Sequence, residues 1–338
     1  MDESTEHGFS RREFLAGTST LGAAALLGLS RTAAAEPPPE TTRLRLVRAT
    51  AVCNAPQYVA EALLRAEGFT EIRYTRDLGR SVVENVASGE GDLGMGFAGT
   101  VVSRIDAGDP VVAFAGVHVG CYELFGTSRV NAITDLKGKT VAVWQLGGDH
   151  HLFVASMAAY VGLNPHKDIR WIAESPEDAI RHLAEEKIDA YLAFAPEQYE
   201  LRERRIGHVV VNTTTDKPWS HYFCCLLTGN REFVRKYPVA TKRAMRAILK
   251  AADICTQEPE RVARFLVDKG YAPRYDHALQ TIKDLPYDTW RTHDPEDTMR
   301  FFALRLHEVG MIKSSPQKII AQGTDWRFLN ELKKELKA

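Results

Sequence analysis

The sequence has almost no net charge, because 43 Lys and Arg residues stand against 44 Asp and Glu residues over 338 positions. This balance excludes a broad electrostatic attraction to nucleic acid or to an anionic membrane surface. No apolar run in the mature part approaches the roughly 20 residues that a membrane-spanning helix needs. Ordinary proportions of proline (15 residues) and of apolar residues (44%) exclude disordered, collagen-like and disulfide-dense chains. The length predicts two domains of about 150 residues each.

Cysteine is scarce, and its spacing excludes the usual cysteine-based scaffolds. The count is odd and no C-x-x-C pair is present, which argues against a disulfide framework and a structural zinc site. Adjacent cysteines rarely pair with each other because the geometry is strained. We expect buried free thiols that behave as small apolar residues, although one long-range disulfide stays open in an oxidising compartment. The five cysteines are Cys53, Cys121, Cys224, Cys225 and Cys255.

The N-terminus predicts an export signal. Ser10–Leu15 reads S-R-R-E-F-L and matches the twin-arginine pattern S-R-R-x-F-L at every defined position. A weakly hydrophobic stretch, Leu15–Leu29, and the small residues Ala33–Ala35 follow in the order that defines a secretory signal. The alternative is an amphipathic helix with an accidental arginine pair. We expect residues 1–35 to be a signal peptide read by the twin-arginine export machinery, without a lipid anchor, and residues 36–42 to be a linker.

After the linker, short strands alternate with helices. Apolar periodicity predicts a first series with strands 44–49, 70–75, 92–97 and 111–117 and helices 56–66, 81–87 and 100–107. A second series has strands 140–144, 169–172, 190–194 and 209–212 and helices 152–161 and 177–186. Such alternation is typical of a parallel α/β sheet. The pattern therefore predicts two α/β units.

From residue 230 onward the pattern is helical. Prolines at first-turn positions and apolar faces predict helices that cover the sheets rather than a separate bundle. The predicted helices are 231–236, 239–256, 259–269, 275–283, 295–309 and 325–337.

Four segments together carry a resemblance to a known family. They are Asp92–Phe97 (DLGMGF), Asp135–Val143 (DLKGKTVAV), the Gly147–Gly148 turn before a helix, and Thr228–Pro238 (TGNREFVRKYP). In an exported α/β chain these segments resemble the nitrate/sulfonate/taurine-type solute-binding proteins of ABC transporters. That group is related to pyrimidine-precursor-binding and thiamine-pyrimidine-synthase-like proteins. The resemblance runs from residue 43 to the C-terminus, and DLKGKTVAV is its most specific part.

The resemblance implies an α/β, two-lobed periplasmic-binding-protein type II fold with a helical C-terminal region. Residues 43–120 and 225–338 would form the first lobe and residues 121–224 the second, with the ligand clamped between them by hinge closure. The implied function is the periplasmic solute-binding component of an ABC importer, which serves a permease and its ATPase. We expect a monomer without a cofactor and without a nucleic-acid partner.

The candidate binding residues come from loops at strand ends. Ligands of parallel α/β sheets lie beyond the carboxyl ends of strands, where helix N-termini offer unpaired N–H groups. The alternative for each residue is structural: an N-cap, a tight turn or core packing. The candidates are Asn54, Gln57, Tyr58, Phe97, Gly99, Thr100, Gly148, Asp149, His150, His151, Glu197, Ser220, His221 and Tyr222.

A metal site is a second interpretation of the same region. Suitable donor types are present in Asp149, Cys225 and the four candidate ligands His150, His151, His221 and Cys224. Neighbouring histidines on a helix point apart, which weakens this interpretation.

The sequence does not predict catalysis. The related pyrimidine synthases need a lysine for pyridoxal phosphate, a sacrificial histidine and a cysteine-rich iron segment. Here Asn54–Gly68 has neither Lys nor His, and Phe223–Cys225 matches only part of the cysteine-rich segment. The G-x-S-x-G, Walker and H-E-x-x-H motifs are absent.

The ligand itself stays open at this stage. The resemblance favours an oxyanion or a sulfonate, whereas aromatic residues near the predicted cleft favour a flat heterocycle such as a pyrimidine. These aromatic residues are Trp144, Trp219, Tyr222 and Phe223. An exported ligand-sensing domain would share the fold.

Overall fold

The computed structural model describes residues 36–49, 51–75 and 80–337. The chain divides into two compact units, Met1–Pro37 and Pro38–Ala338, and the second holds every helix and strand named below. The predicted signal peptide, residues 1–35, lies outside the described residues. Among the described residues, no helix is both long enough and apolar enough to cross a membrane.

Five strands form a first sheet, which we call sheet I: β1 (Arg43–Leu46), β2 (Glu71–Tyr74), β3 (Leu93–Phe97), β4 (Val111–Val119) and β10 (Phe223–Asn230). Their order is β2-β1-β3-β10-β4. β1 is parallel to β2 and β3, whereas β10 runs antiparallel between β3 and β4. A strand from late in the chain therefore completes a sheet that the early residues begin.

Five further strands form sheet II: β5 (Tyr122–Gly126), β6 (Lys139–Val143), β7 (Ile169–Ala173), β8 (Ala190–Phe194) and β9 (His208–Asn212). Their order is β7-β6-β8-β5-β9. β6 is parallel to β7 and β8, whereas β5 runs antiparallel to β8 and β9. Each sheet thus has a parallel part and one strand of opposite direction.

Two segments carry the chain between the sheets. The first crossing is Gly120–Cys121, between β4 and β5, and the second is residues 213–222, between β9 and β10. Thr213 joins them, because its Oγ1 donates to the Tyr122 carbonyl (2.8 Å) and accepts the Tyr122 N–H (3.1 Å). Gly120 has φ +81°, and a Cβ there would lie 2.2 Å from Oγ1 of Thr214. The close approach of the two crossings therefore requires glycine at position 120.

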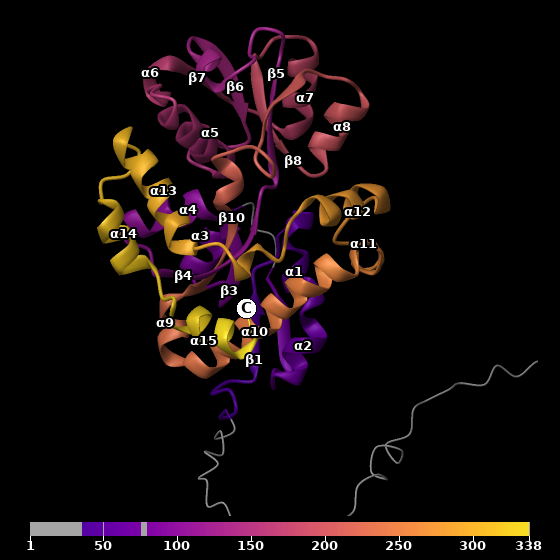
Figure 1. Ribbon diagram of the computed structural model, residues 1–338, viewed down its shortest axis with the longest axis vertical. Helices are drawn as coiled ribbons and strands as arrows, with labels where there is room; N and C mark the ends of the chain where they lie inside the picture. The colour runs from indigo at the N-terminus through magenta and orange to yellow at the C-terminus, as the bar shows by residue number, and fades with distance from the viewer. Residues whose placement is uncertain (1–35, 50, 76–79, 338) are drawn as a thin grey trace, which may run out of the picture. The chain divides into compact units, whose positions relative to one another are not determined.

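Helices flank both sheets (Figure 1). Ser81 and Glu84 form a reciprocal capping box at the start of α3, which satisfies backbone N–H groups that the helix itself leaves unpaired. With sheet I lie η1 (Val52–Asn54), α1 (Ala55–Val59), α2 (Glu61–Ala66), α3 (Val82–Ala87) and α4 (Ala98–Asp106). With sheet II lie η2 (Ile133–Leu136), α5 (Asp149–Tyr160), α6 (Pro165–Asp168), α7 (Pro176–Ala184), α8 (Glu197–Glu203) and, on the second crossing, η3 (Trp219–His221).

The C-terminal region is helical, as the sequence predicts. Its elements are α9 (Arg231–Lys236), α10 (Pro238–Gln257), α11 (Pro259–Asp268), α12 (Tyr275–Asp284), η4 (Thr289–Arg291), α13 (Pro295–Glu308), α14 (Pro316–Gly323) and α15 (Arg327–Glu335). α10 packs on α1 and α2, while α13 contacts both α4 and α5. The C-terminal helices therefore touch elements that accompany each sheet (Figure 1).

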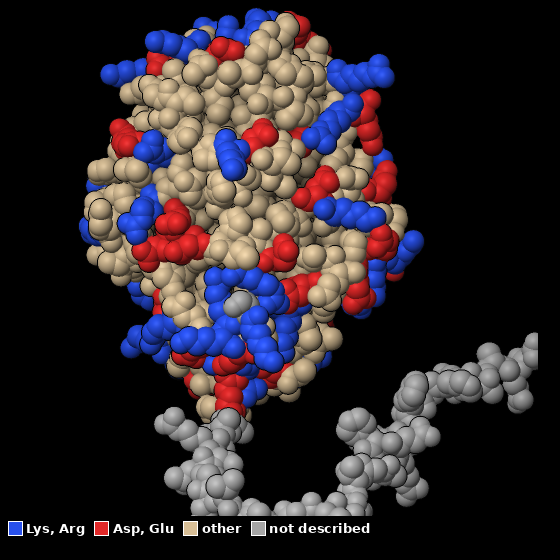
Figure 2. Space-filling model, viewed as in Figure 1, with Lys and Arg blue, Asp and Glu red and all other residues tan. Residues whose placement is uncertain are grey.

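The surface agrees with the balanced composition. Figure 2 shows positive and negative side chains interspersed over the viewed face, with a group of positive side chains near the C-terminus. Ion pairs between opposite charges include Arg246 with Glu67 at 2.8 Å and Lys242 with Glu331 at 2.8 Å.

The prediction of purely parallel sheets is wrong. β5 and β10, the strands that the crossings lead into, run antiparallel to their neighbours, and neither was predicted. Both are buried along almost their whole length and lack the alternation of a half-exposed strand, as do the predicted strands β3, β4 and β8. Helices α6, α8 and α14 were also not predicted.

Candidate functional site

The starts of α4 and α5 meet at the junction between the sheets. Thr100, in the first turn of α4, donates a hydrogen bond from Oγ1 to Oδ1 of Asp149, the first residue of α5. Burial raises the pKa of Asp149 to about 6, against the opposing effect of the Thr100 hydroxyl. The structure therefore brings together two residues that the sequence predicts for the site.

An aromatic cluster adjoins this pair, with Tyr122 at its centre. The Tyr122 ring lies 5.8 Å from Phe97 and 5.5 Å from Phe153. It also lies 5.3 Å from His150 and 5.9 Å from Phe194. Because Phe97 ends β3 and Phe194 ends β8, strand ends of both sheets contribute to the cluster.

The two adjacent histidines have different surroundings. His150 belongs to the aromatic cluster, and its Nε2 is buried without a hydrogen-bond partner. Burial lowers the pKa of His150 to about 4, so its ring is neutral at pH 7 and able to bond a ligand. In contrast, Nδ1 of His151 accepts the Gly147 N–H at 2.9 Å, and its ring packs on Trp171 at 4.5 Å. His151 is therefore structural.

Four thiols gather where the crossings meet sheet I. The thiols of Cys53, Cys121, Cys224 and Cys225 form a closed ring of side-chain contacts, in which Cys53 and Cys224 each touch the other two. We call this group the thiol ring. The prediction of buried free thiols is confirmed. Contacts with Cys121 and Cys225 lower the pKa of the Cys53 thiol well below its usual range, whereas burial raises the pKa of Cys224.

His118 adds an imidazole to the thiol ring. Its ring nitrogen Nδ1 lies 3.1 Å from the Val119 carbonyl and must donate to it, which leaves Nε2 as the nitrogen that could bind a ligand. That Nε2 is buried without a partner. The donor atoms of Cys53, His118 and Cys225 lie within 4.8 Å of one another. A tetrahedral ion with bonds of about 2.0–2.3 Å needs ligands somewhat closer than this, so these residues could hold a soft metal after a small inward movement.

The histidines considered as metal ligands from the sequence lie at separate places. His150, His151 and His221 do not converge: the first lies in the aromatic cluster, the second packs on Trp171, and the third is exposed beside His293. Side chains one residue apart on a helix face different directions, and His221 lies on a different segment from both.

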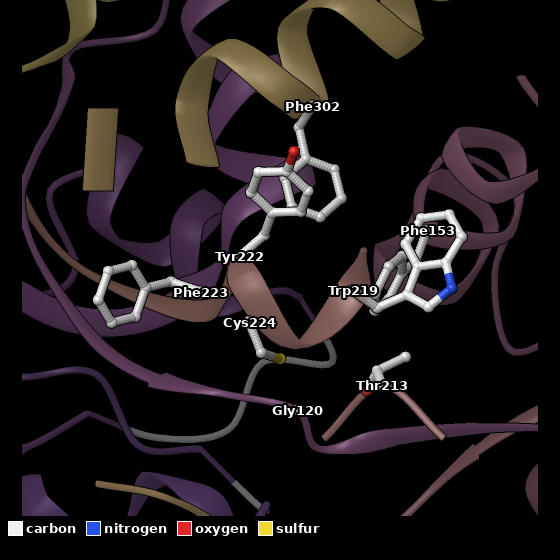
Figure 3. Close-up of a pocket in the computed structure, with 8 residues that line it drawn as sticks. All are labelled: Gly120, Phe153, Thr213, Trp219, Tyr222, Phe223, Cys224 and Phe302. Carbon is white, nitrogen blue, oxygen red and sulfur yellow. The ribbon is translucent and has the colours of Figure 1, made fainter. Parts of the chain in front are cut away.

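A hollow beside the second crossing is lined by aromatic rings (Figure 3). It has no room for a water molecule. Trp219 and Phe153 meet edge to face at 6.1 Å, and Tyr222 stacks on Phe301 at 4.0 Å. This region is packed rather than open. The lining residues are Gly120, Phe153, Thr213, Trp219, Tyr222, Phe223, Cys224 and Phe302.

A second hollow has room for solvent or a ligand. It measures about 130 Å³ and lies between α8 and α12, and we call it the α8–α12 cavity. Glu123 lines it, and one of its oxygens, Oε1, accepts hydrogen bonds from Arg202 and from Nδ2 of Asn212 (2.9 Å). Burial raises the pKa of Glu123 to about 7, although Arg202 opposes the shift.

Three candidates from the first predicted loop are buried and bonded to the protein. Gln57 donates to the Val47 carbonyl at 2.9 Å, and Tyr58 donates to the Ala49 carbonyl at 2.7 Å. Asn54 makes only a long contact with the Cys53 sulfur, 3.7 Å, and its Oδ1 is buried without a partner. Asn54 and Gln57 therefore each keep a buried side-chain oxygen without a partner, and that of Asn54 is next to the thiol ring.

The remaining candidates lie at several places. Gly148 is the N-cap residue of α5, and Gly99 leaves space for the Phe97 ring. Glu197 accepts a hydrogen bond from Tyr191 at 2.5 Å, and burial raises its pKa to about 7. Ser220, His221 and Tyr222 lie on the second crossing.

The sequence reasoning missed several residues at the junction. Tyr122, Glu123, His118, Cys53 and Cys121 were not proposed for the site. A signal was present in the run HVGCYE, residues 118–123, which places a histidine, a thiol, a phenol and a carboxyl exactly between the two predicted units.

Comparison with known proteins places these observations in a wider group. A nitrate/nitrite-binding protein NrtA of Nostoc sp. is 21% identical over 146 residues, which are 43% of this chain and 33% of the relative. The match therefore spans a third of that relative's length.

Solved structures match over most of the chain. The periplasmic nitrate-binding protein NrtA from Synechocystis has a TM-score of 0.72 at 14% identity, covering 89% of this chain and 90% of its own. The alkanesulfonate-binding protein SsuA from Xanthomonas axonopodis, bound to MOPS, has a TM-score of 0.66 at 17% identity, covering 87% and 100%. The desulfurization enzyme DszB has a TM-score of 0.60 at 14% identity, covering 87% and 99%.

These likenesses show a periplasmic-binding-protein fold, as the sequence predicts. The fold alone does not separate binding from catalysis, because unrelated functions share folds. The description NMT1/THI5 like matches residues 72–262, more than half of the chain. The chain therefore belongs to the NMT1/THI5-like family.

Proposed function

We propose that this chain is the extracytoplasmic solute-binding component of an ABC importer. One observation carries the proposal: strand ends and helix starts of two sheets, connected by two crossings, converge on the Thr100–Asp149 pair. The fold shared with nitrate- and alkanesulfonate-binding proteins supports it. The S-R-R-E-F-L segment supports export through the twin-arginine pathway. The protein is expected to bind rather than transform its ligand.

The proposed mechanism is closure of two lobes about the crossings. Sheet I with the C-terminal helices would form one lobe and sheet II the other, with the ligand held at the junction. The Thr100–Asp149 bond joins the two sides, so it belongs to the closed form. A ligand that touches both sides stabilises this form, which the permease would recognise. Moving a 1:99 equilibrium to 99:1 requires about 5.5 kcal/mol of differential binding energy.

A ligand screen tests this proposal. The melting temperature of the purified chain is measured with nitrate, alkanesulfonates, taurine and pyrimidines. A ligand at 100 times its Kd adds about 2.7 kcal/mol to the stability of the folded state. Solution scattering then measures the radius of gyration, which we expect to fall with the ligand that raises the melting temperature. A saturating ligand that leaves the radius unchanged would contradict lobe closure.

A second candidate function is binding of a soft metal ion at the thiol ring. The observation that favours it is the convergence of Cys53, His118 and Cys225, with a buried, unpartnered imidazole nitrogen. Thiolate and imidazole ligands select Zn²⁺ or Cu⁺ over hard cations. Elemental analysis of untagged protein tests it, with Cys53→Ser as the variant and Cys255→Ser as the matched control. Less than a tenth of an equivalent of metal after incubation with Zn²⁺ or Cu⁺ would exclude this function.

A further inference from the structure

The α8–α12 cavity is built from parts of the chain that lie far apart in sequence. α8 and β5 supply one side, the crossings supply residues at its edge, and α12 supplies the opposite side (Figure 1). Its solvent-accessible space, about 130 Å³, is well above the roughly 10–15 Å³ that one water molecule needs. The cavity therefore suits a small molecule or one end of a larger one.

Two buried hydrogen-bond acceptors in this cavity have no partner. Oε2 of Glu123 and Oε1 of Gln198 are both without a hydrogen bond, and both residues line the cavity. Their exposed fractions are 4% and 6%. A buried acceptor without a partner costs free energy, more so when it is charged. The cavity thus has two positions that a hydrogen-bond donor would stabilise.

The donors of the cavity wall are already engaged. Nδ2 of Asn212 donates to Oε1 of Glu123 at 2.9 Å, and the Tyr199 hydroxyl donates to Oδ2 of Asp284 at 3.2 Å. The Thr281 hydroxyl donates to a backbone carbonyl at 2.8 Å. An incoming group therefore meets two unpartnered acceptors beside these engaged donors, although Thr214 and Arg202 bring further donor groups to the lining.

The charged residues that line the cavity also favour a cationic group over an oxyanion. Glu123 and Asp284 supply two carboxyl groups, and Arg202 supplies one guanidinium that is already bonded to Glu123. An oxyanion would bring only acceptors and a negative charge against them. An ammonium or guanidinium group would bring donors and form charge-assisted bonds, which are shorter and stronger than neutral ones.

We propose that the α8–α12 cavity binds the ammonium or guanidinium end of a small ligand and not an oxyanion. The inference rests on the proposed binding function and names the chemical class of part of its solute. Because α8 accompanies sheet II and α12 belongs to the C-terminal region, such a group would touch both proposed lobes. The cavity would thereby contribute to closure as well as to selectivity.

Titration calorimetry of the purified chain tests the inference. The probes are methylammonium, ethanolamine and methylguanidine, with acetate, nitrate and methanesulfonate as anionic counterparts at constant ionic strength. We expect at least one cation to bind and the anions not to compete with it. Glu123→Gln should weaken the binding of the cation about tenfold or more, because it replaces a charged acceptor by an amide. Glu177→Gln, an exposed carboxyl on α7, is the matched control and should leave binding unchanged.

A second variant keeps the test decisive if Glu123→Gln fails to fold. Gln198→Met has nearly the same size and removes the other free acceptor, so it should also weaken cation binding. No cation binding, or equal binding to the wild type and Gln198→Met, overturns the inference.

The two proposals fail in different ways. A solute that closes the protein yet binds the wild type and Glu123→Gln equally overturns the cavity assignment and leaves the solute-binding function standing. A cation that binds through Glu123 without any change in the radius of gyration supports the cavity assignment and counts against closure.

Discussion

The Thr100 hydroxyl donates a hydrogen bond to the Asp149 carboxylate across the junction of the two sheets. Thr100 follows β3 of sheet I, and Asp149 follows β6 of sheet II. The bond therefore connects the first turns of two helices whose strands belong to different sheets. Glu84 and Cys53 are the other groups that act on this carboxyl, and both favour its neutral form.

Replacement of this carboxyl should change how stability depends on pH. The pKa of Asp149 rises from 3.8 to about 6 in the folded state. The folded protein holds this proton more tightly than the unfolded chain does, so the carboxyl does not lower the stability below pH 3.8. Above pH 6, where the carboxyl is charged in both states, it lowers the stability by the full amount. We expect the unfolding free energy of the wild type to fall relative to Asp149→Asn between these values, by on the order of 3 kcal/mol. Urea unfolding at several pH values measures this difference.

The comparison needs a control because other buried carboxyl groups titrate in a similar pH range. Burial raises the pKa of both Glu123 and Glu197 to about 7, so only the difference between the wild type and the variant is informative. Asp288→Asn, at an exposed position, should reproduce the wild-type profile. Parallel profiles for the wild type and Asp149→Asn would show that the carboxyl is not buried at the junction.

Truncation of the central aromatic ring should destabilise the protein strongly. Tyr122 is buried and contacts rings from both sheets. Tyr122→Ala should cost about 3–5 kcal/mol, as large-to-small changes of buried aromatic residues do. Tyr222→Ala should cost less, because Tyr222 is only partly buried and stacks mainly on Phe301. Urea unfolding of the two variants measures the contrast, and equal losses would contradict the central position of Tyr122.

Much of the fold could be predicted from local pattern. Predicted strand 190–194 and helix 231–236 coincide with β8 and α9, because clear apolar patterns and an Asn cap at residue 230 mark them. β5 and β10 escaped prediction, and burial alone does not explain this, because β8 is buried to the same degree. Their antiparallel direction follows from the crossings, and local pattern carries no information about which sheet a strand joins.

Residues of the candidate site also differ in how far they could be predicted from local pattern. Thr100 and Asp149 could be predicted because strand-to-helix loops form ligand sites in α/β folds. Glu123 and His118 lie in the conspicuous run HVGCYE, but the groups that they meet follow only from the crossings, which bring them next to distant segments. Tyr58 looked like a cleft residue but is bonded to Ala49 and stacked on Tyr271 at 3.8 Å.

The thiols should be free but unreactive in the native protein. All five cysteines are buried and unpaired, and thiol reagents attack accessible thiolates. We expect slow reaction with a disulfide reagent under native conditions and five reactive thiols after unfolding in the absence of reductant. The fifth thiol, Cys255, lies on α10 outside the thiol ring, so Cys255→Ser should lower the final count to four. A count of three in the wild type would reveal a disulfide within the thiol ring.

The crossings should tolerate change at Gly120 poorly. A Cβ at this position would lie 2.2 Å from Oγ1 of Thr214 and 2.9 Å from its Cβ, and the backbone has φ +81°. Gly138 provides a matched control, because it has φ +74° but no atom within 4 Å of the added Cβ. Gly138→Ala should therefore cost about 1 kcal/mol from backbone strain alone.

Gly120→Ala adds a steric clash to that strain and should cost about 2–4 kcal/mol in unfolding free energy. Because the clash separates the two crossings, the variant should also bind any lobe-closing ligand more weakly. Urea unfolding and ligand titration of both glycine variants measure the two effects. Equal losses for Gly120→Ala and Gly138→Ala would mean that the crossings are not in contact. A stability loss at Gly120 with unchanged ligand affinity would mean that they touch but do not govern closure.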